Sequence, residues 1–249
     1  MTDPIRIVGS FLSPYVRKVL ACLRWKGLAY AVDPIVPFFG NERFTALSPL
    51  RRVPVMIDGP LALADSSVIC QYLEDRYPER PLYPADVADR ARARWLEEYA
   101  DTRLGDVFVW RLFNERVIGR FVWNRPTDEE KVARTIAEDV PEVMAWLEAQ
   151  VPADGFLLGA LSIADVSVAA FFRNAAFVGV TVDPGRWPRL AAWLERVLVL
   201  ECFTHLEPFE KVSLRTPIPR HREALAAAGA PLTADTFFTA TPRRGPLSV

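Results

Sequence analysis

A change in the pattern of secondary structure near residue 80 constrains the fold of this 249-residue chain more than any other feature. Before it, short strand-like runs alternate with helical patterns, which is typical of an α/β unit. After it, strand signals largely vanish and long helical patterns follow. The sequence therefore predicts an α/β domain over residues 1–80, a Pro-rich linker over 81–86 and an all-helical domain over 87–212.

The first domain is expected to run in the order β-α-β-α-β-β-α. A strand over 5–9 is followed by a helix that stops near Gly27, a second strand within 29–36 and a short helical or irregular segment over 41–47. The runs VPVMI and LALA, joined by Asp58-Gly59-Pro60, predict an antiparallel hairpin. A last helix ends at Pro78.

The second domain is predicted to hold four long helices, over about 87–119, 127–150 after a Thr127 cap, 162–178 and 186–201. Beyond it, residues 213–249 are rich in Pro, Thr and Ala, with room for a short helix over 222–228. This composition predicts a poorly packed extension.

Composition favours a soluble globular protein. Hydrophobic residues make up 51% of the chain, and the net charge of −1 gives no reason to expect nucleic acid or an anionic membrane as partner. The three cysteines lie far apart in apolar helical patterns, so we expect buried reduced thiols, no metal site and a cytoplasmic location. No basic leader and no bilayer-length apolar run is recognisable.

Ser13 and Pro14 stand where the first strand gives way to the first helix. A serine N-cap followed by proline is a common helix start, since the hydroxyl accepts a backbone N–H bond and proline lacks only an N–H that the helix does not use. The same position suits a ligand, because helix N-termini favour anions and a hydroxyl can donate to a thiolate. Both interpretations stay open from these residues alone.

Two arginines and a proline begin the third predicted strand. Pro54 could simply mark a sheet edge. A cis Val53–Pro54 bond is the alternative, because it would let Val53 offer its N–H and C=O to a peptide-like ligand. Arg51 and Arg52 could hold a carboxylate or lie solvated at the surface.

Asp65 and Ser66 stand between the hairpin and the next helix. Asp65 fits as an N-cap, with the following apolar residues as the helix's core face. Alternatively, the Ser66 hydroxyl and N–H bind a carboxylate while Asp65 pairs with an ammonium group beside it. The amino-acid end of a ligand would satisfy both residues.

In this order and at these spacings, the three sites resemble the cytosolic glutathione transferase superfamily over about residues 4–210. The similarity is carried by SPYVRKVLACLRWKG, by LLGALSIADVSVAAFF and, most specifically, by SPLRRVPVMIDGPLALADSSVICQYLEDRYPERPLYPAD. The resemblance implies a thioredoxin-like first domain, an all-α second domain, glutathione bound on the first and, usually, a homodimer.

The resemblance also implies which hydroxyl acts on the thiol. Ser13 matches the activating serine of the serine-type classes, as in bacterial, tau or phi members. A serine at this position, where omega-like members have cysteine, argues against a mixed-disulfide reductase. Ser10 and Tyr15 are the other hydroxyls near the loop that could serve instead.

Binding roles follow from the same resemblance. Val53 before a cis Pro54 is expected to pair with the cysteinyl backbone of glutathione, and Asp65 with Ser66 to hold its γ-glutamyl end. Arg52 stands where some classes have a basic residue that meets the glycine carboxylate.

A conjugating enzyme also needs an apolar, electrophilic second substrate. Aromatic side chains of the first long helix could line its pocket, and an adjacent arginine could add polarity, although aromatics at helical spacing are more often core. The candidates are Phe108, Trp110 and Arg111.

Ser162 and Asp165, three residues apart, fit a reciprocal capping box in the second domain. We expect Asp165 to be structural, so that its loss costs folding more than turnover.

The sequence thus predicts a detoxification-type glutathione transferase that joins the glutathione thiolate to a small apolar electrophile. Two alternatives stay open. One is a glutathione-dependent peroxidase or lyase that uses the same site. The other is a non-catalytic binding or assembly protein of the same fold, whose extension covers the ligand cleft or recruits a partner.

Overall fold

The computed structural model describes residues 4–246 and divides the chain into two compact units. The first comprises residues 1–80 together with 201–249, and the second comprises residues 81–200. The division after residue 80 lies where the predicted linker begins. The helical unit ends after residue 200, whereas the sequence predicted an end after residue 212. The difference arises because the chain from Glu201 onward packs with the α/β unit.

The first unit is built on a mixed sheet of four strands in the order β2-β1-β3-β4. β1 (Ile5–Val8) pairs in parallel with β2 (Tyr30–Asp33) and antiparallel with β3 (Val55–Asp58). β3 in turn pairs antiparallel with β4 (Leu61–Leu63), which is the predicted hairpin. The α/β fold class expected for this part of the chain is therefore confirmed.

Helices cover the sheet. α1 (Pro14–Lys26) packs against α3 (Ser66–Arg76), while the short α2 (Glu42–Leu47) begins after an Asn41 cap. Successive strand residues point to opposite faces of a sheet, and the adjacent β1 residues Ile7 and Val8 are both fully buried. Both faces of this sheet are therefore covered.

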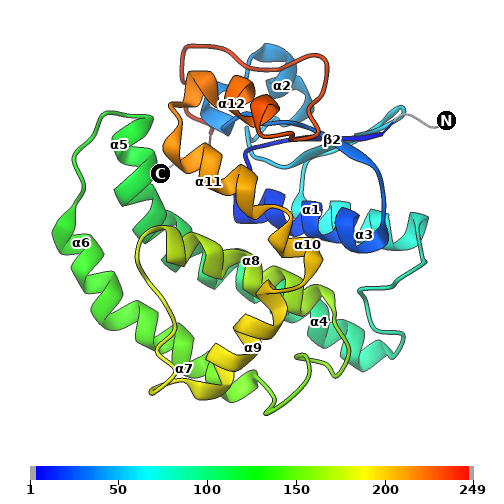
Figure 1. Ribbon diagram of the computed structural model, residues 1–249, viewed down its shortest axis with the longest axis vertical. Helices are drawn as coiled ribbons and strands as arrows, with labels where there is room; N and C mark the ends of the chain where they lie inside the picture. The colour runs from blue at the N-terminus through cyan, green and yellow to red at the C-terminus, as the bar shows by residue number, and fades with distance from the viewer. Residues whose placement is uncertain (1–3, 247–249) are drawn as a thin grey trace. The chain divides into compact units, whose positions relative to one another are not determined.

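The expectation of a poorly packed extension is wrong. After α10 (Glu201–Thr204) and α11 (Glu207–Arg215), the chain forms a short turn, η4 (Ile218–Arg220), and α12 (His221–Ala227). Figure 1 shows the red chain after α12 passing β2 and α2, and Leu232 and Phe238 of this chain form bridges with Val32 and Gly40. The composition led to a wrong prediction because prolines and threonines disfavour a long helix but still allow the chain to pair at the edge of a sheet.

The long elements of the second unit are all helices, as expected. α4 (Val87–Tyr99) continues through η2 (Ala100–Ile118) into α5 (Gly119–Phe121), and residue i+5 bonds to residue i along η2. This continuous run corresponds to the helix predicted over 87–119.

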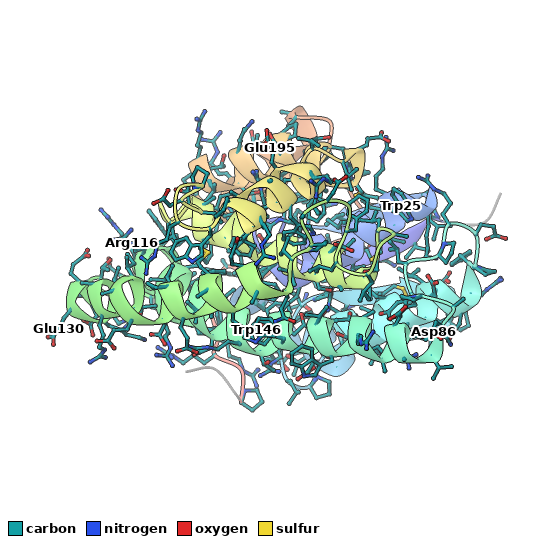
Figure 2. All side chains as sticks on the ribbon, turned by 90° about the horizontal axis from the view of Figure 1, so that it is seen from below. Trp25, Asp86, Arg116, Glu130, Trp146 and Glu195 are labelled. Atoms are coloured by element: carbon teal, nitrogen blue, oxygen red, sulfur yellow. The ribbon has the colours of Figure 1, made fainter. Side chains whose placement is uncertain are left out.

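A second continuous run joins α6 (Glu129–Arg134), η3 (Thr135–Asp139) and α7 (Val140–Gln150). Figure 2 shows it from Glu130 to Trp146. Its observed cap is Asp128, whose carboxylate accepts from the Lys131 N–H at 2.9 Å. The predicted cap, Thr127, instead donates to the Glu115 carbonyl at 3.3 Å.

The remaining predicted helices are α8 (Ile163–Phe177) and α9 (Pro188–Leu198). α8 packs against α4, η2 and α9, and most of its side chains are buried. None of the described helices is both long and apolar enough to cross a bilayer.

The predicted capping box starts α8. The fully buried Asp165 accepts from the Ser162 N–H and hydroxyl, each at 2.9 Å. It also accepts from the Leu157 N–H at 2.8 Å and from the Trp193 indole at 2.9 Å. One carboxylate thus ties the start of α8 to the preceding loop and to α9.

Replacing Asp165 with Ala is expected to lower the free energy of unfolding by at least about 3 kcal/mol, because several buried donors lose their acceptor at about 1–3 kcal/mol each. Urea denaturation measures the loss. Asp183→Ala is the matched control, since Asp183 is exposed and accepts only in a surface turn. Equal midpoints for both variants would refute a structural role for Asp165.

Candidate functional site

Three of the predicted stretches meet at one end of the sheet. Val8, the last residue of β1, pairs with Val55, the first residue of β3. The chain that leaves β1 toward Ser13 therefore starts beside the Val53 loop, which enters β3. β4 runs antiparallel to β3 and so leads to Asp65 at this same end. We refer to it as the site end of the sheet.

Ser13 is the N-cap of α1. Its hydroxyl oxygen accepts from the Val16 N–H at 3.4 Å, and Pro14 follows it in the first turn. The side chain is half-buried. Because the hydroxyl accepts in this bond, its own hydrogen is left to donate elsewhere. Capping and donation to a ligand are therefore compatible at this one residue.

The other two hydroxyls are placed differently. Ser10 is 5% exposed, and its hydroxyl accepts from the Leu12 N–H at 3.2 Å. Its carbonyl accepts from the Ser13 N–H at 3.0 Å, so Ser10 belongs to the turn that leads into α1. Tyr15 is half-buried within the first turn of α1. Ser13 is thus more accessible than Ser10.

The Val53–Pro54 peptide bond is cis, which was one of the two alternatives. Val53 is half-buried, and within residues 4–246 neither its N–H nor its C=O takes part in a hydrogen bond. Backbone N–H and C=O groups without a partner are what an extended peptide ligand needs for pairing. The structure therefore leaves Val53 able to bind such a ligand.

Gly9 allows the Val53 loop to approach α1 closely. Its φ of 152° lies in a region that other residues rarely adopt. A Cβ atom at this position would lie 2.4 Å from Cγ2 of Val16 and 3.1 Å from Cβ of Val53. The missing side chain thus brings the first turn of α1 against the Val53 loop.

Asp65 and Ser66 begin α3. One oxygen of the exposed Asp65 carboxylate accepts from the N–H groups of Ser67 and Val68, each at 3.0 Å. Ser66 is buried, and its hydroxyl and N–H have no partner in the described part of the chain. The capping interpretation of Asp65 holds, and the start of α3 still presents a donor N–H and hydroxyl.

A residue missed by the sequence analysis links the two helix starts. Lys18 of α1 is fully buried, and its ammonium group donates to the Ser67 hydroxyl at 3.0 Å. Its neighbour Arg17 is 1% exposed and pairs with Glu210 of α11. Two adjacent cations inside an apolar helix were the signal that could have identified them, because buried charges require partners.

The two arginines before Val53 have different surroundings. Arg51 is buried and donates to the carbonyls of Gly40 and Pro37 at 2.8 and 3.3 Å, which makes it structural. Arg52 is exposed, and its side chain forms no hydrogen bond or ion pair with residues 4–246. Arg52 is therefore the cation available to an anionic ligand.

The residues considered for a second substrate lie in η2. Phe108 has no exposed surface and packs against Phe172 at 5.2 Å between ring centroids, so the structure gives it a core role in place of the expected pocket role. Arg111 forms ion pairs with Asp106 and Asp139. Trp110 is half-buried.

No group of three or more His, Cys, Asp or Glu side chains within residues 4–246 is arranged to hold a metal ion. The thiols of Cys22 and Cys70 lie 3.6 Å apart in the core between α1 and α3. Burial raises the pKa of the Cys202 thiol to about 12. That thiol is therefore protonated and unreactive at neutral pH.

Comparison with known proteins identifies two family models along the chain. The glutathione S-transferase N-terminal domain matches residues 8–81, and the glutathione S-transferase C-terminal domain matches residues 115–196. The chain beyond residue 196, which includes α10 to α12, lies outside both matches.

Among relatives, glutathione S-transferase U3 of Arabidopsis thaliana is 24% identical over 227 residues, covering 84% of this chain and 95% of that protein. Glutathione S-transferase 1 of Dianthus caryophyllus is 36% identical over 93 residues, covering 36% and 42% of the two chains.

Solved structures agree with this fold. A glutathione S-transferase from Rhodospirillum rubrum F11 superposes with a TM-score of 0.78 at 26% identity, covering 88% of this chain and 99% of that chain. Glutathione S-transferase-I bound with lactoylglutathione gives a TM-score of 0.71 at 18% identity, with coverages of 82% and 98%.

Gly9→Ala is expected to lower the free energy of unfolding by about 1–3 kcal/mol more than backbone strain alone, because the new methyl group overlaps Val16 and Val53. Urea denaturation measures the difference. Gly59→Ala is the control, since Gly59 also has a positive φ of 57° but no atom within 4 Å of the added Cβ. Equal losses in both variants would contradict a close approach at Gly9.

Proposed function

We propose that this chain, which belongs to the glutathione S-transferase family, binds glutathione at the site end of its sheet and joins the sulfur to a small apolar electrophile. The observation that carries the proposal is a half-buried Ser13 hydroxyl at the start of α1 together with, at the same end of the sheet, a Val53 backbone that has no partner among the described residues.

Binding uses groups that surround this hydroxyl. The Val53 N–H and C=O pair with the peptide backbone of the glutathione cysteine in an extended arrangement. At the γ-glutamyl end, Ser66 donates to the α-carboxylate at the start of α3, and the second oxygen of Asp65 accepts from the ammonium group. Arg52 meets the glycine carboxylate.

Ser13 favours the reactive form of the bound thiol. Its hydroxyl donates a hydrogen bond to the sulfur, and the N-terminus of α1 adds a favourable field for a negative charge. Each unit of pKa corresponds to about 1.4 kcal/mol, so a thiol pKa lowered by about two units stabilises the thiolate by roughly 2.7 kcal/mol. That shift ionises a large fraction of the thiol near neutral pH.

In the reaction, the thiol proton passes to solvent and the sulfur lone pair forms a bond to the electrophilic carbon. A leaving group departs with the electrons of its bond, or, in an addition, the displaced π electrons take up a proton. Trp110 remains the aromatic candidate for contact with this second substrate, whereas Phe108 belongs to the core.

The alternative functions use the same glutathione-binding residues but differ in the reaction that follows binding. A peroxidase or lyase would turn over glutathione with a hydroperoxide or a thioether in place of the electrophile, and a substrate screen separates these reactions. The C-terminal extension was the reason to consider a non-catalytic assembly protein. It packs within the first unit, so there is no longer a reason to treat it as a free tail that recruits a partner.

Ser13→Ala is expected to reduce kcat/KM for conjugation of chlorodinitrobenzene by about 100-fold, because one donor to the developing charge is lost. Glutathione affinity, measured by calorimetry, should change little, since the peptide contacts remain. The ultraviolet absorbance of bound thiolate should fall with the rate. Ser10→Ala is the matched control and should retain activity.

Absence of glutathione binding by the unaltered protein would end the proposal. Binding with unchanged conjugation in Ser13→Ala would leave Ser13 as a cap alone and move the activating role to Ser10 or Tyr15. A homodimer remains a prediction from the family, and a cytoplasmic location remains a prediction from the three reduced cysteines.

A further inference from the structure

The chain after α12 extends the sheet of the first unit. The Val32 N–H donates to the Pro231 carbonyl at 2.7 Å, and the Thr233 N–H donates to the Val32 carbonyl at 3.1 Å. Leu232 thereby pairs in parallel with Val32 of β2, at an edge that would otherwise be open. We call residues 230–243 the C-terminal strap.

The strap then crosses the loop that follows β2. The Asn41 N–H donates to the Phe237 carbonyl at 2.8 Å, and the Thr239 N–H donates to the Phe39 carbonyl at 2.7 Å. Phe238 stacks on Phe39 with ring centroids 5.8 Å apart. Backbone bonds in both directions therefore fix residues 38–41 against the strap.

A buried carboxylate anchors this crossing. Asp33, the last residue of β2, is fully buried and accepts from the Thr236 hydroxyl and the Phe237 N–H, each at 2.7 Å. Arg222 of α12 adds a third donor at 3.2 Å. Burial raises the pKa of this carboxyl, although these donors oppose the shift. Removal of the strap would take away two of the three donors to this buried carboxylate, which is costly because a desolvated acceptor needs its partners.

Phe237 anchors the strap in a buried apolar cluster close to the candidate site. It is 3% exposed and belongs to a cluster with four buried residues of the sheet, of α2 and of the loop after β2: Val8, Ile35, Phe44 and Val55. Val53, the residue with unpaired backbone, packs against this same cluster. The strap thus supplies one member of the cluster against which Val53 packs.

A second route reaches the same loop through polar groups. Arg51, one residue before Arg52 and two before Val53, donates to the Gly40 and Pro37 carbonyls. Those carbonyls lie in the loop that the strap crosses. The strap is therefore linked to the Val53 loop in two ways, through the Phe237 cluster and through residues 37–41.

We propose that the C-terminal strap is part of the glutathione site, with Phe237 as a positioning residue that holds Val53 in the geometry required for pairing with the glutathione backbone. The inference rests on the proposed function and adds to it a segment outside the residues matched by either family model. Phe237 acts through Val53 and not on the sulfur, so it governs glutathione affinity and leaves the chemical step unchanged.

Thermodynamic reciprocity gives the inference a second consequence. If the strap strengthens glutathione binding, bound glutathione must stabilise the docked strap by the same factor. Hydrogen exchange of the Asn41 and Thr239 amides, which bond across the strap, should therefore slow when glutathione is added.

Phe237→Ala in the full chain is expected to weaken glutathione binding, measured by calorimetry, at least about tenfold, because a small displacement of a pairing group is costly. KM for glutathione should rise by a similar factor while kcat at saturating glutathione is retained. Phe237→Leu, which refills much of the space, should restore most of the affinity.

Met56→Ala is the matched control. Met56 is fully buried in β3 next to Val55, but neighbouring strand residues face opposite sides of the sheet and Met56 is not part of the Phe237 cluster. Thermal denaturation sets the temperature so that every variant is folded during the binding measurement. Met56→Ala should lower the thermal midpoint at least as much and change glutathione affinity less than about twofold.

The possible outcomes separate the two proposals. A wild-type chain that does not bind glutathione overturns the proposed function and this inference together. A wild-type chain that binds, with Phe237→Ala binding equally well, overturns the inference alone. Equal loss of affinity in Met56→Ala also overturns it, because the effect would then reflect general stability.

Discussion

The pairing of Val8 with Val55 is the constraint on which the candidate site depends. It fixes the register of the strands that lead out to Ser13 and in from Val53, so a shift by one residue would turn every side chain to the wrong face. Gly9 lets the two connections touch, because no Cβ stands between α1 and the Val53 loop. Hydroxyl, helix N-terminus and unpaired backbone are therefore held by a rigid sheet.

Buried charged side chains connect the segments that surround this sheet. Lys18 joins α1 to Ser67 at the start of α3, and Asp33 receives three donors from the C-terminal part of the chain. A charge removed from water needs such partners, so each one favours the arrangement in which its donors or acceptors are in place. Polar anchors thus set where segments dock, while apolar clusters such as the one around Phe237 supply most of the stabilisation.

Local signals in the sequence were sufficient for much of the fold. Periodicity located the strands and helices, and the short-range chemistry of Ser13-Pro14, Asp65 and the Ser162–Asp165 box correctly marked helix starts. The Thr127 cap was placed one residue early, since Asp128 is an equally good cap next to it. The sequence alone could not assign Phe108 to the core or to a substrate pocket, because aromatic residues recur at the same spacing on a helix in both cases. The structure places it in the core.

The sequence by itself determined the element order, the two-part organisation near residue 80 and the stretches that carry the family resemblance, because these depend on neighbouring residues. Only the tertiary structure decided that Val53 lacks a backbone partner within the described residues, that Arg52 and not Arg51 is accessible, and that the C-terminal strap completes the first unit. Phe237 and Asp33 are about two hundred residues apart in the chain. A contact across that separation leaves no periodic trace, so it emerges only when the chain is folded.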